Sequence, residues 1–161
     1  MLKCATNQEN ETLDRLTGVF RGSGILFTLV GGAACREYGL RRPTNDMDFV
    51  VKPYPLAMNI LSASGSFVLV VDDRPDLTGR TCTRKDTKTG VLVDFLTGGI
   101  RITDHALLGS LEYSDPLPIP EPSGFGDVAR LNTLIAMKVG AITSGLDTRA
   151  LGANCGRART T

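Results

Sequence analysis

Two aspartates separated by one residue are the clearest sign of chemistry in this chain of 161 residues. Asp46 and Asp48 stand at the start of an apolar run that continues to Val51. Because side chains in a strand alternate between faces, residues i and i+2 project in the same direction. Two adjacent carboxylates repel each other when both are ionised, and a divalent cation removes that repulsion. Mg²⁺ takes oxygen ligands, so the pair predicts a metal site.

A third acid, Asp94, lies in the middle of the segment 91–96, which is rich in β-branched and aromatic residues. This composition predicts a strand, and an acid inside a buried strand needs a partner. If the strand neighbours that of Asp46 and Asp48, the three carboxylates form a cluster of the kind that holds one or two metal ions. The alternative is that the first two acids are solvated at a strand start and that Asp94 lies at an exposed edge.

Two consecutive glycines, Gly31 and Gly32, follow the apolar run 25–30 and precede the Ala-rich segment 33–38. Glycine has no Cβ, so the backbone N–H groups of such a bend can approach a ligand closely. The N-terminus of a helix also favours anions. The bend therefore predicts a phosphate-binding turn, with a tight turn that binds no ligand as the alternative.

The order of these motifs resembles the polymerase-β-like nucleotidyltransferase superfamily. Gly31 and Gly32 are followed by thirteen residues, then by Asp-x-Asp, and later by a third acid. The local pattern, with Arg42-Pro43-Thr44 before the acids, is similar to the small branch of AbiEii-type toxins and minimal nucleotidyltransferases. The resemblance covers about residues 25–95 and extends faintly to a helix around 134–138.

This resemblance implies a metal-dependent site with defined roles. Asp46, Asp48 and Asp94 would be catalytic and would bind Mg²⁺, or Mn²⁺ in its place. Nucleotide and phosphate contacts would come from Gly31, Gly32, Arg42, Thr44 and Lys138. Three of these assignments have simpler alternatives: Arg42 can lie on the surface, Thr44 can brace the turn, and Lys138 can be a solvated helix lysine.

The resemblance implies an enzyme that transfers a nucleoside monophosphate from an NTP to an acceptor hydroxyl and releases pyrophosphate. ATP is the expected nucleotide, whereas the acceptor is left open between a protein, a tRNA end and a small molecule. A catalytically silent nucleotide-binding or interaction module of the same fold is the alternative, because Thr143-Ser144-Gly145 ends the last predicted helix where similar proteins often continue it. A dinucleotide-binding fold is set aside because the third glycine of its motif is missing.

The elements around these residues predict an α/β (α+β) fold, a mixed β-sheet with helices mainly on one face. Apolar periodicity predicts helices over 9–21, 33–38, 56–64 and 127–142. Strands are predicted over 25–30, 46–52, 67–71, 81–85 and 91–96, with a turn-rich loop over 72–79.

Length and composition predict one domain over 1–145 and a disordered tail over 146–161. The formal net charge of +1 argues neither for a large nucleic-acid surface nor for an acidic tail. No apolar run approaches the roughly 20 residues of a membrane helix, so no membrane partner is expected. Four cysteines without a Cys-x-x-Cys pair predict free thiols and a cytoplasmic location.

Overall fold

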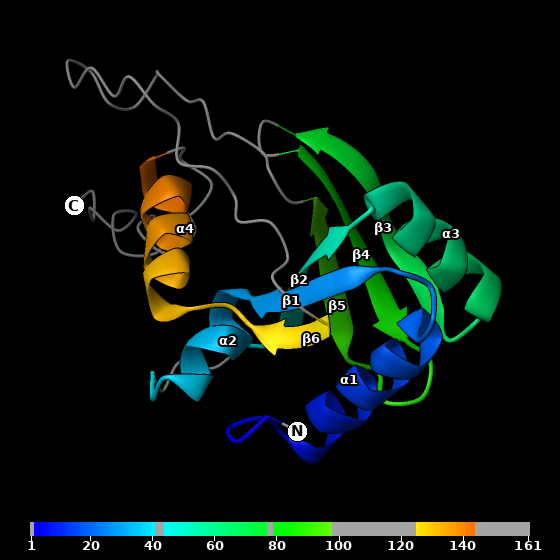
Figure 1. Ribbon diagram of the computed structural model, residues 1–161, viewed down its shortest axis with the longest axis horizontal. Coiled ribbons are helices and arrows are strands. Elements are labelled where there is room, and N and C mark those ends of the chain that lie inside the picture. The colour runs from blue at the N-terminus through cyan, green and yellow to red at the C-terminus, as the bar shows by residue number, and fades with distance from the viewer. Residues whose placement is uncertain (1, 41–43, 77–78, 98–124, 144–161) are drawn as a thin grey trace, which may run out of the picture.

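The computed structural model describes residues 2–40, 44–76, 79–97 and 125–143 as an α+β fold (Figure 1). The strands are β1 (Leu26–Val30), β2 (Asp46–Lys52), β3 (Phe67–Asp76), β4 (Gly79–Asp86), β5 (Leu92–Thr97) and β6 (Phe125–Val128). The helices are α1 (Asn7–Phe20), α2 (Gly31–Glu37), α3 (Tyr54–Ser64) and α4 (Leu131–Thr143). The predicted fold class is confirmed.

The strands form one mixed sheet in the order β3-β4-β5-β2-β1-β6. The central strand β2 pairs in the antiparallel sense with β1 and in the parallel sense with β5. β3, β4 and β5 form an antiparallel meander, and β6 adds to β1 in parallel. The two strands that carry the predicted acids, β2 and β5, are therefore neighbours.

One face of the sheet is packed with aromatic side chains under α1 and α3. Phe20 of α1 contacts Phe27 of β1 edge to face, with 5.4 Å between the ring centroids. Phe27 contacts Phe49 at 5.8 Å, and Phe49 stacks on Phe95 at 6.4 Å. All four rings are fully buried, as is Leu61 of α3. Burial of aromatic and aliphatic area on this face is the main source of stability for the fold.

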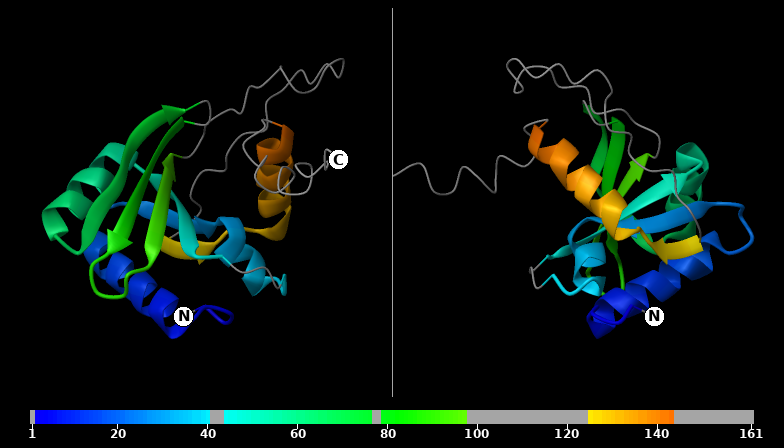
Figure 2. Two further views of the ribbon diagram at one scale, coloured as in Figure 1. Left: turned by 180° about the vertical axis from the view of Figure 1, so that it is seen from behind. Right: turned by 60° about the vertical axis from the view of Figure 1, so that its left-hand side comes forward.

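The helices occupy two places around the sheet (Figure 2). α1 and α3 contact each other, whereas α4 packs against α2. Helix α1 begins with a capping box, in which Thr6 accepts from the backbone of Glu9 and the Glu9 side chain accepts from the backbone of Thr6. Its apolar residues Leu13, Leu16 and Phe20 share one side of the helix and are buried.

Two predicted boundaries are wrong. The last helix begins at Leu131 and not at Asp127, because residues Phe125–Val128 form β6 beside β1. The predicted loop over 72–79 is largely strand, because β3 continues to Asp76 and stays paired with β4 through two register shifts. A proline at position 75 is compatible with this strand, since β3 is the edge of the sheet and needs donors on one side only.

The tail over 146–161 and the end of the predicted domain at 145 lie outside the described residues, so the domain division stays a prediction. Within the described part of the chain, no helix combines the length and the apolar character that a membrane span requires. Among the described cysteines, Cys4 is exposed, Cys35 is half-buried and Cys82 is buried.

Candidate functional site

The three acids lie on the same face of the sheet, opposite the aromatic core. Asp46 and Asp48 are two residues apart in β2. The alternate residues Met47 and Phe49 are buried on the other side of the sheet. Asp94 is the direct partner of Asp48 in the parallel pair β2–β5. Cross-strand partners project from the same face, so the sheet places these carboxylates side by side.

The electrostatics of Asp48 reflect this crowding. Burial, then the charge of Asp46 and then that of Asp94 raise the pKa of Asp48 from 3.8 to about 7. The positive charge of Lys138 and a hydrogen bond from the backbone of Gly32 oppose this rise in pKa only in part. Burial, with a further contribution from Asp46, also raises the pKa of Asp94. The cluster therefore carries negative charge that its own surroundings do not fully offset.

Each carboxylate accepts a hydrogen bond from a different part of the chain. Thr44, in the segment before β2, donates its hydroxyl to the carboxylate of Asp46. Thr83 Oγ1 on β4 donates to Asp94 Oδ1 at 2.5 Å. The backbone of Gly32, in the first turn of α2, donates to Asp48. These donors fix how the acids are oriented, and they place Thr44 as a brace for Asp46.

The two glycines are needed for the close approach of the chain to Asp48. Gly31 has a φ of +65°, and a Cβ there would lie 1.8 Å from Asp48 Oδ2. A Cβ on Gly32 would lie 3.1 Å from Cβ of Thr44. Any other residue at position 31 would have to displace the carboxylate and adopt a strained backbone conformation. The glycine bend and the acids are thus parts of one site.

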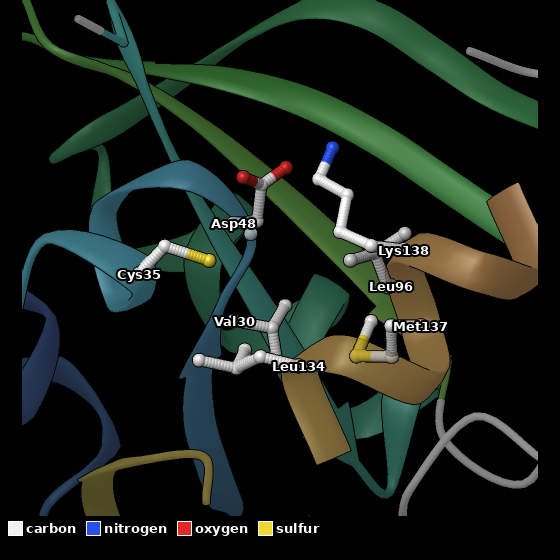
Figure 3. Close-up of a pocket in the computed structure, with 8 residues that line it drawn as sticks. Val30, Cys35, Asp48, Leu96, Leu134, Met137 and Lys138 are labelled. Atoms are coloured by element: carbon white, nitrogen blue, oxygen red, sulfur yellow. The ribbon is translucent and has the colours of Figure 1, made fainter. Parts of the chain in front are cut away.

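A pocket of about 180 Å³ opens beside Asp48 on the side of α4. Its lining is mostly apolar and comes from β1, β5, α2 and α4 through Val30, Cys35, Leu96, Leu134 and Met137, with Gly31, Asp48 and Lys138 as the remaining members. Figure 3 shows the Asp48 carboxylate and the Lys138 side chain at one end of the pocket, with Leu134 and Met137 at the other. Lys138 therefore faces the site and is not a helix lysine on a remote surface.

The donor chemistry of the cluster suits a hard divalent cation, because all three acids offer carboxylate oxygens, and burial together with the charges of Asp46 and Asp94 raises the pKa of Asp48. In the described part of the chain, however, no three His, Cys, Asp or Glu side chains converge closely enough to count as a metal-binding group. One oxygen of Asp46 and one of Asp94, Oδ1 in each case, accept hydrogen bonds from threonine hydroxyls.

The structure brings together seven of the eight predicted site residues, namely Gly31, Gly32, Thr44, Asp46, Asp48, Asp94 and Lys138. The eighth, Arg42, lies outside the described residues. Sequence reasoning missed Thr83, whose only signal was a polar residue inside a strand whose register with β5 could not be foreseen. It also missed the apolar wall of the pocket, since Leu134 and Met137 looked like ordinary core residues of a helix.

Comparison with known proteins shows the fold. No protein-family profile matches the chain, and no curated protein matches it. The crystal structure of a Thermotoga maritima protein that is provisionally assigned as a nucleotidyltransferase (TM1012) matches with a TM-score of 0.55 and 16% identity, over 92% of this chain and 96% of that chain. A tRNA-processing enzyme (apo form I) matches with a TM-score of 0.42 and 22% identity, over 58% of this chain and 24% of that chain.

At these identities the likeness concerns the fold alone, and the low TM-score of the second match carries no argument. Neither match speaks for the AbiEii-type branch, so that assignment stays a prediction. The chain has the fold of a protein provisionally assigned as a nucleotidyltransferase.

Proposed function

We propose that the protein is a metal-dependent nucleotidyltransferase, which moves a nucleoside monophosphate from an NTP to an acceptor hydroxyl and releases pyrophosphate. The observation that carries this proposal is the pairing of Asp94 with Asp48 across β2 and β5, with Asp46 two residues away on the same face. Three carboxylates beside a glycine bend suit a polyphosphate that arrives with its cation.

In this proposal Asp46, Asp48 and Asp94 hold Mg²⁺, with Mn²⁺ able to replace it. When bound, the ion supplies Lewis-acid stabilisation of the charge that develops on the phosphoryl oxygens. Asp94 also has a second role, because its raised pKa suits a carboxylate that accepts the proton of the attacking hydroxyl.

The proposed phosphate contacts come from the glycine bend and from α4. The Gly31–Gly32 bend binds the β- and γ-phosphates beside Asp48, because neither glycine has a side chain that would keep a ligand from the backbone. Lys138 supplies a positive charge at the end of the pocket. Arg42 remains a proposed phosphate ligand, and Thr44 acts chiefly through Asp46.

The proposal also names the nucleotide donor and the class of acceptor. ATP is the expected donor, and a protein hydroxyl, a tRNA end or a small molecule is the acceptor. A cytoplasmic location and the AbiEii-type branch belong to the same proposal, and their support is the sequence alone.

A catalytically silent nucleotide-binding or interaction module is the second candidate. The observations that favour it are that no group of three metal-binding side chains is found among the described residues, and that two of the acids accept hydrogen bonds from threonines. A protein that binds a nucleotide without transferring it has no need to bring the three carboxylates onto an ion.

The test is label transfer from [α-³²P]ATP with Mg²⁺ to fractions of a cell lysate. We expect the wild type to label one fraction and Asp46→Asn and Asp48→Asn to lower the rate by about 1,000-fold, since several kcal/mol of stabilisation are lost. Asp14→Asn is the matched control, because Asp14 is exposed on α1, and should retain the wild-type rate.

Isothermal titration with ATP and Mg²⁺ separates the two candidates. Binding by the wild type without transfer to any fraction would favour the silent module. Full transfer by both Asp46→Asn and Asp48→Asn would contradict the assigned roles.

A further inference from the structure

Thr83 lies outside every motif that pointed to the site, yet it contacts one of the three acids. It is on β4, where it is the direct antiparallel partner of Asp94 on β5. Its neighbours Cys82 and Arg84 are buried on the opposite, helix-covered face. Thr83 therefore belongs to a row across neighbouring strands, Thr83–Asp94–Asp48–Val30, which leads directly to the glycine bend.

The contact between Thr83 and Asp94 is short and well defined. Thr83 Oγ1 donates to Asp94 Oδ1 at 2.5 Å, and both side chains are half-buried. Hydrogen bonds to an ionised acceptor are shorter and stronger than those between neutral groups. A β-branched side chain has few χ1 rotamers, so the hydroxyl is held in place by the strand.

This hydrogen bond acts on the charge of Asp94 as well as on its direction. It lowers the pKa of Asp94, against the opposing effects of burial and of Asp46. The other two acids have equivalent donors, Thr44 for Asp46 and the backbone of Gly32 for Asp48, and both of these come from the glycine–aspartate stretch itself. Thr83 is the one donor to the cluster that a distant strand supplies, among the contacts described.

We propose that Thr83 is a positioning residue for the transfer reaction: by occupying Oδ1 of Asp94, it fixes the carboxylate plane and assigns Oδ2 to the metal ion or to the acceptor hydroxyl. The inference rests on the proposed function, because Thr83 would act on the reaction only through Asp94. Misplacing a reacting group by about 1 Å can lower a rate by about 100-fold, so the loss of this contact should be visible in turnover.

The test compares variants that remove the hydroxyl with one that keeps it. Thr83→Val preserves the shape, Thr83→Ala removes the branch as well, and Thr83→Ser retains the donor. Thr97→Val is the matched control: Thr97 is on β5, the strand of Asp94, but on the opposite face, and its buried hydroxyl has no hydrogen-bond partner among the described residues.

The readout is kcat and KM for ATP in [α-³²P]ATP label transfer, with the melting temperature of every variant as a folding control. We expect Thr83→Val and Thr83→Ala to lower kcat by about tenfold to 100-fold while KM for ATP stays within about twofold. Thr83→Ser should recover most of the wild-type kcat, and Thr97→Val should match the wild type. If Thr83→Val does not fold, the comparison of Thr83→Ala with Thr83→Ser decides.

Three results would overturn the inference. Wild-type kcat in both Thr83→Val and Thr83→Ala would show that the hydroxyl does not matter. A Thr83→Ser variant as impaired as Thr83→Val, at an unchanged melting temperature, would show that packing of the methyl group matters instead. A wild type that transfers no label would overturn the inference together with the proposed function, whereas the first two results leave the proposed function standing.

Discussion

The two faces of β2 and β5 are built from alternate residues of the same short segments, yet they have opposite properties. On the helix-covered face, Phe49 and Phe95 are fully buried and stack on each other. On the other face, Asp48 and Asp94 are paired with each other, and their pKa values are raised. One face therefore stabilises the fold, while the other holds charge at a cost in stability.

This difference is the expected pattern for a site built on a rigid element. Strands keep their side chains within a narrow range of positions, and the aromatic core fixes the strands. Substitutions on the two faces should therefore change different quantities, and at neighbouring positions they should even change stability with opposite signs.

The largest effect on stability is expected for Phe49→Ala, on the aromatic face. Phe49 contacts both Phe27 and Phe95, so truncation leaves a cavity at the centre of the core. We expect a loss of about 4 kcal/mol in the free energy of unfolding, measured by denaturant titration. A loss below about 1 kcal/mol would mean that this face is not the stabilising one.

A smaller loss is expected for Gly31→Ala, where the chain approaches the carboxylate face. The new Cβ would lie 1.8 Å from Asp48 Oδ2, and alanine would have to adopt a φ of +65°. We expect a loss of about 3 kcal/mol and a strong decrease in label transfer.

Gly18→Ala is the matched control for this substitution. Gly18 lies within α1, and nothing lies within 4 Å of a Cβ added there. Alanine should stabilise this helix by about 0.5–1 kcal/mol. Equal effects of the two substitutions in thermal unfolding would argue against a tight contact between the glycine bend and Asp48.

Among the substitutions on the two faces, the smallest effect, and one of opposite sign to the other two, is expected for Asp48→Asn. The pKa of Asp48 is about 7 in the folded protein against 3.8 ordinarily, so the folded state binds the proton more tightly than the unfolded state. Protonation of Asp48 in the folded state stabilises the protein. This contribution is fully present below pH 3.8 and is lost as the pH rises through about 7. Asp48→Asn should therefore be more stable than the wild type at pH 8, by on the order of 2 kcal/mol, and the difference should vanish towards pH 4.

Melting temperatures of both proteins from pH 4 to pH 8 check this expectation. Added Mg²⁺ should raise the melting temperature of the wild type at pH 8 more than that of Asp48→Asn, because the ion offsets the repulsion among the acids. A wild type that is the more stable of the two at pH 8 without metal would show that the acids are not crowded.

Much of this arrangement was predictable because it depends on local pattern. Alternation placed Asp46 and Asp48 together, the apolar run before Gly31 predicted β1, and the prediction of a strand over 46–52 coincides with β2. The glycines were recognised from their type, and the contact of Gly31 with Asp48 gives that recognition a physical reason.

The remainder depends on pairing between distant segments, which a single sequence does not encode locally. β6 is short, contains Gly126 with a φ of +76°, and exists because it pairs with β1. The continuation of β3 depends on its register with β4. The role of Thr83 required the register of β4 against β5, and that of Leu134 required the position of α4 over the site.

The most direct test of the central claim, that three acids and a glycine bend form one nucleotide site, is [α-³²P]ATP label transfer by Asp94→Asn beside the wild type and Asp14→Asn. The account predicts transfer by the wild type and by Asp14→Asn, and a loss of about 100-fold or more for Asp94→Asn. Transfer by Asp94→Asn at the wild-type rate would contradict it.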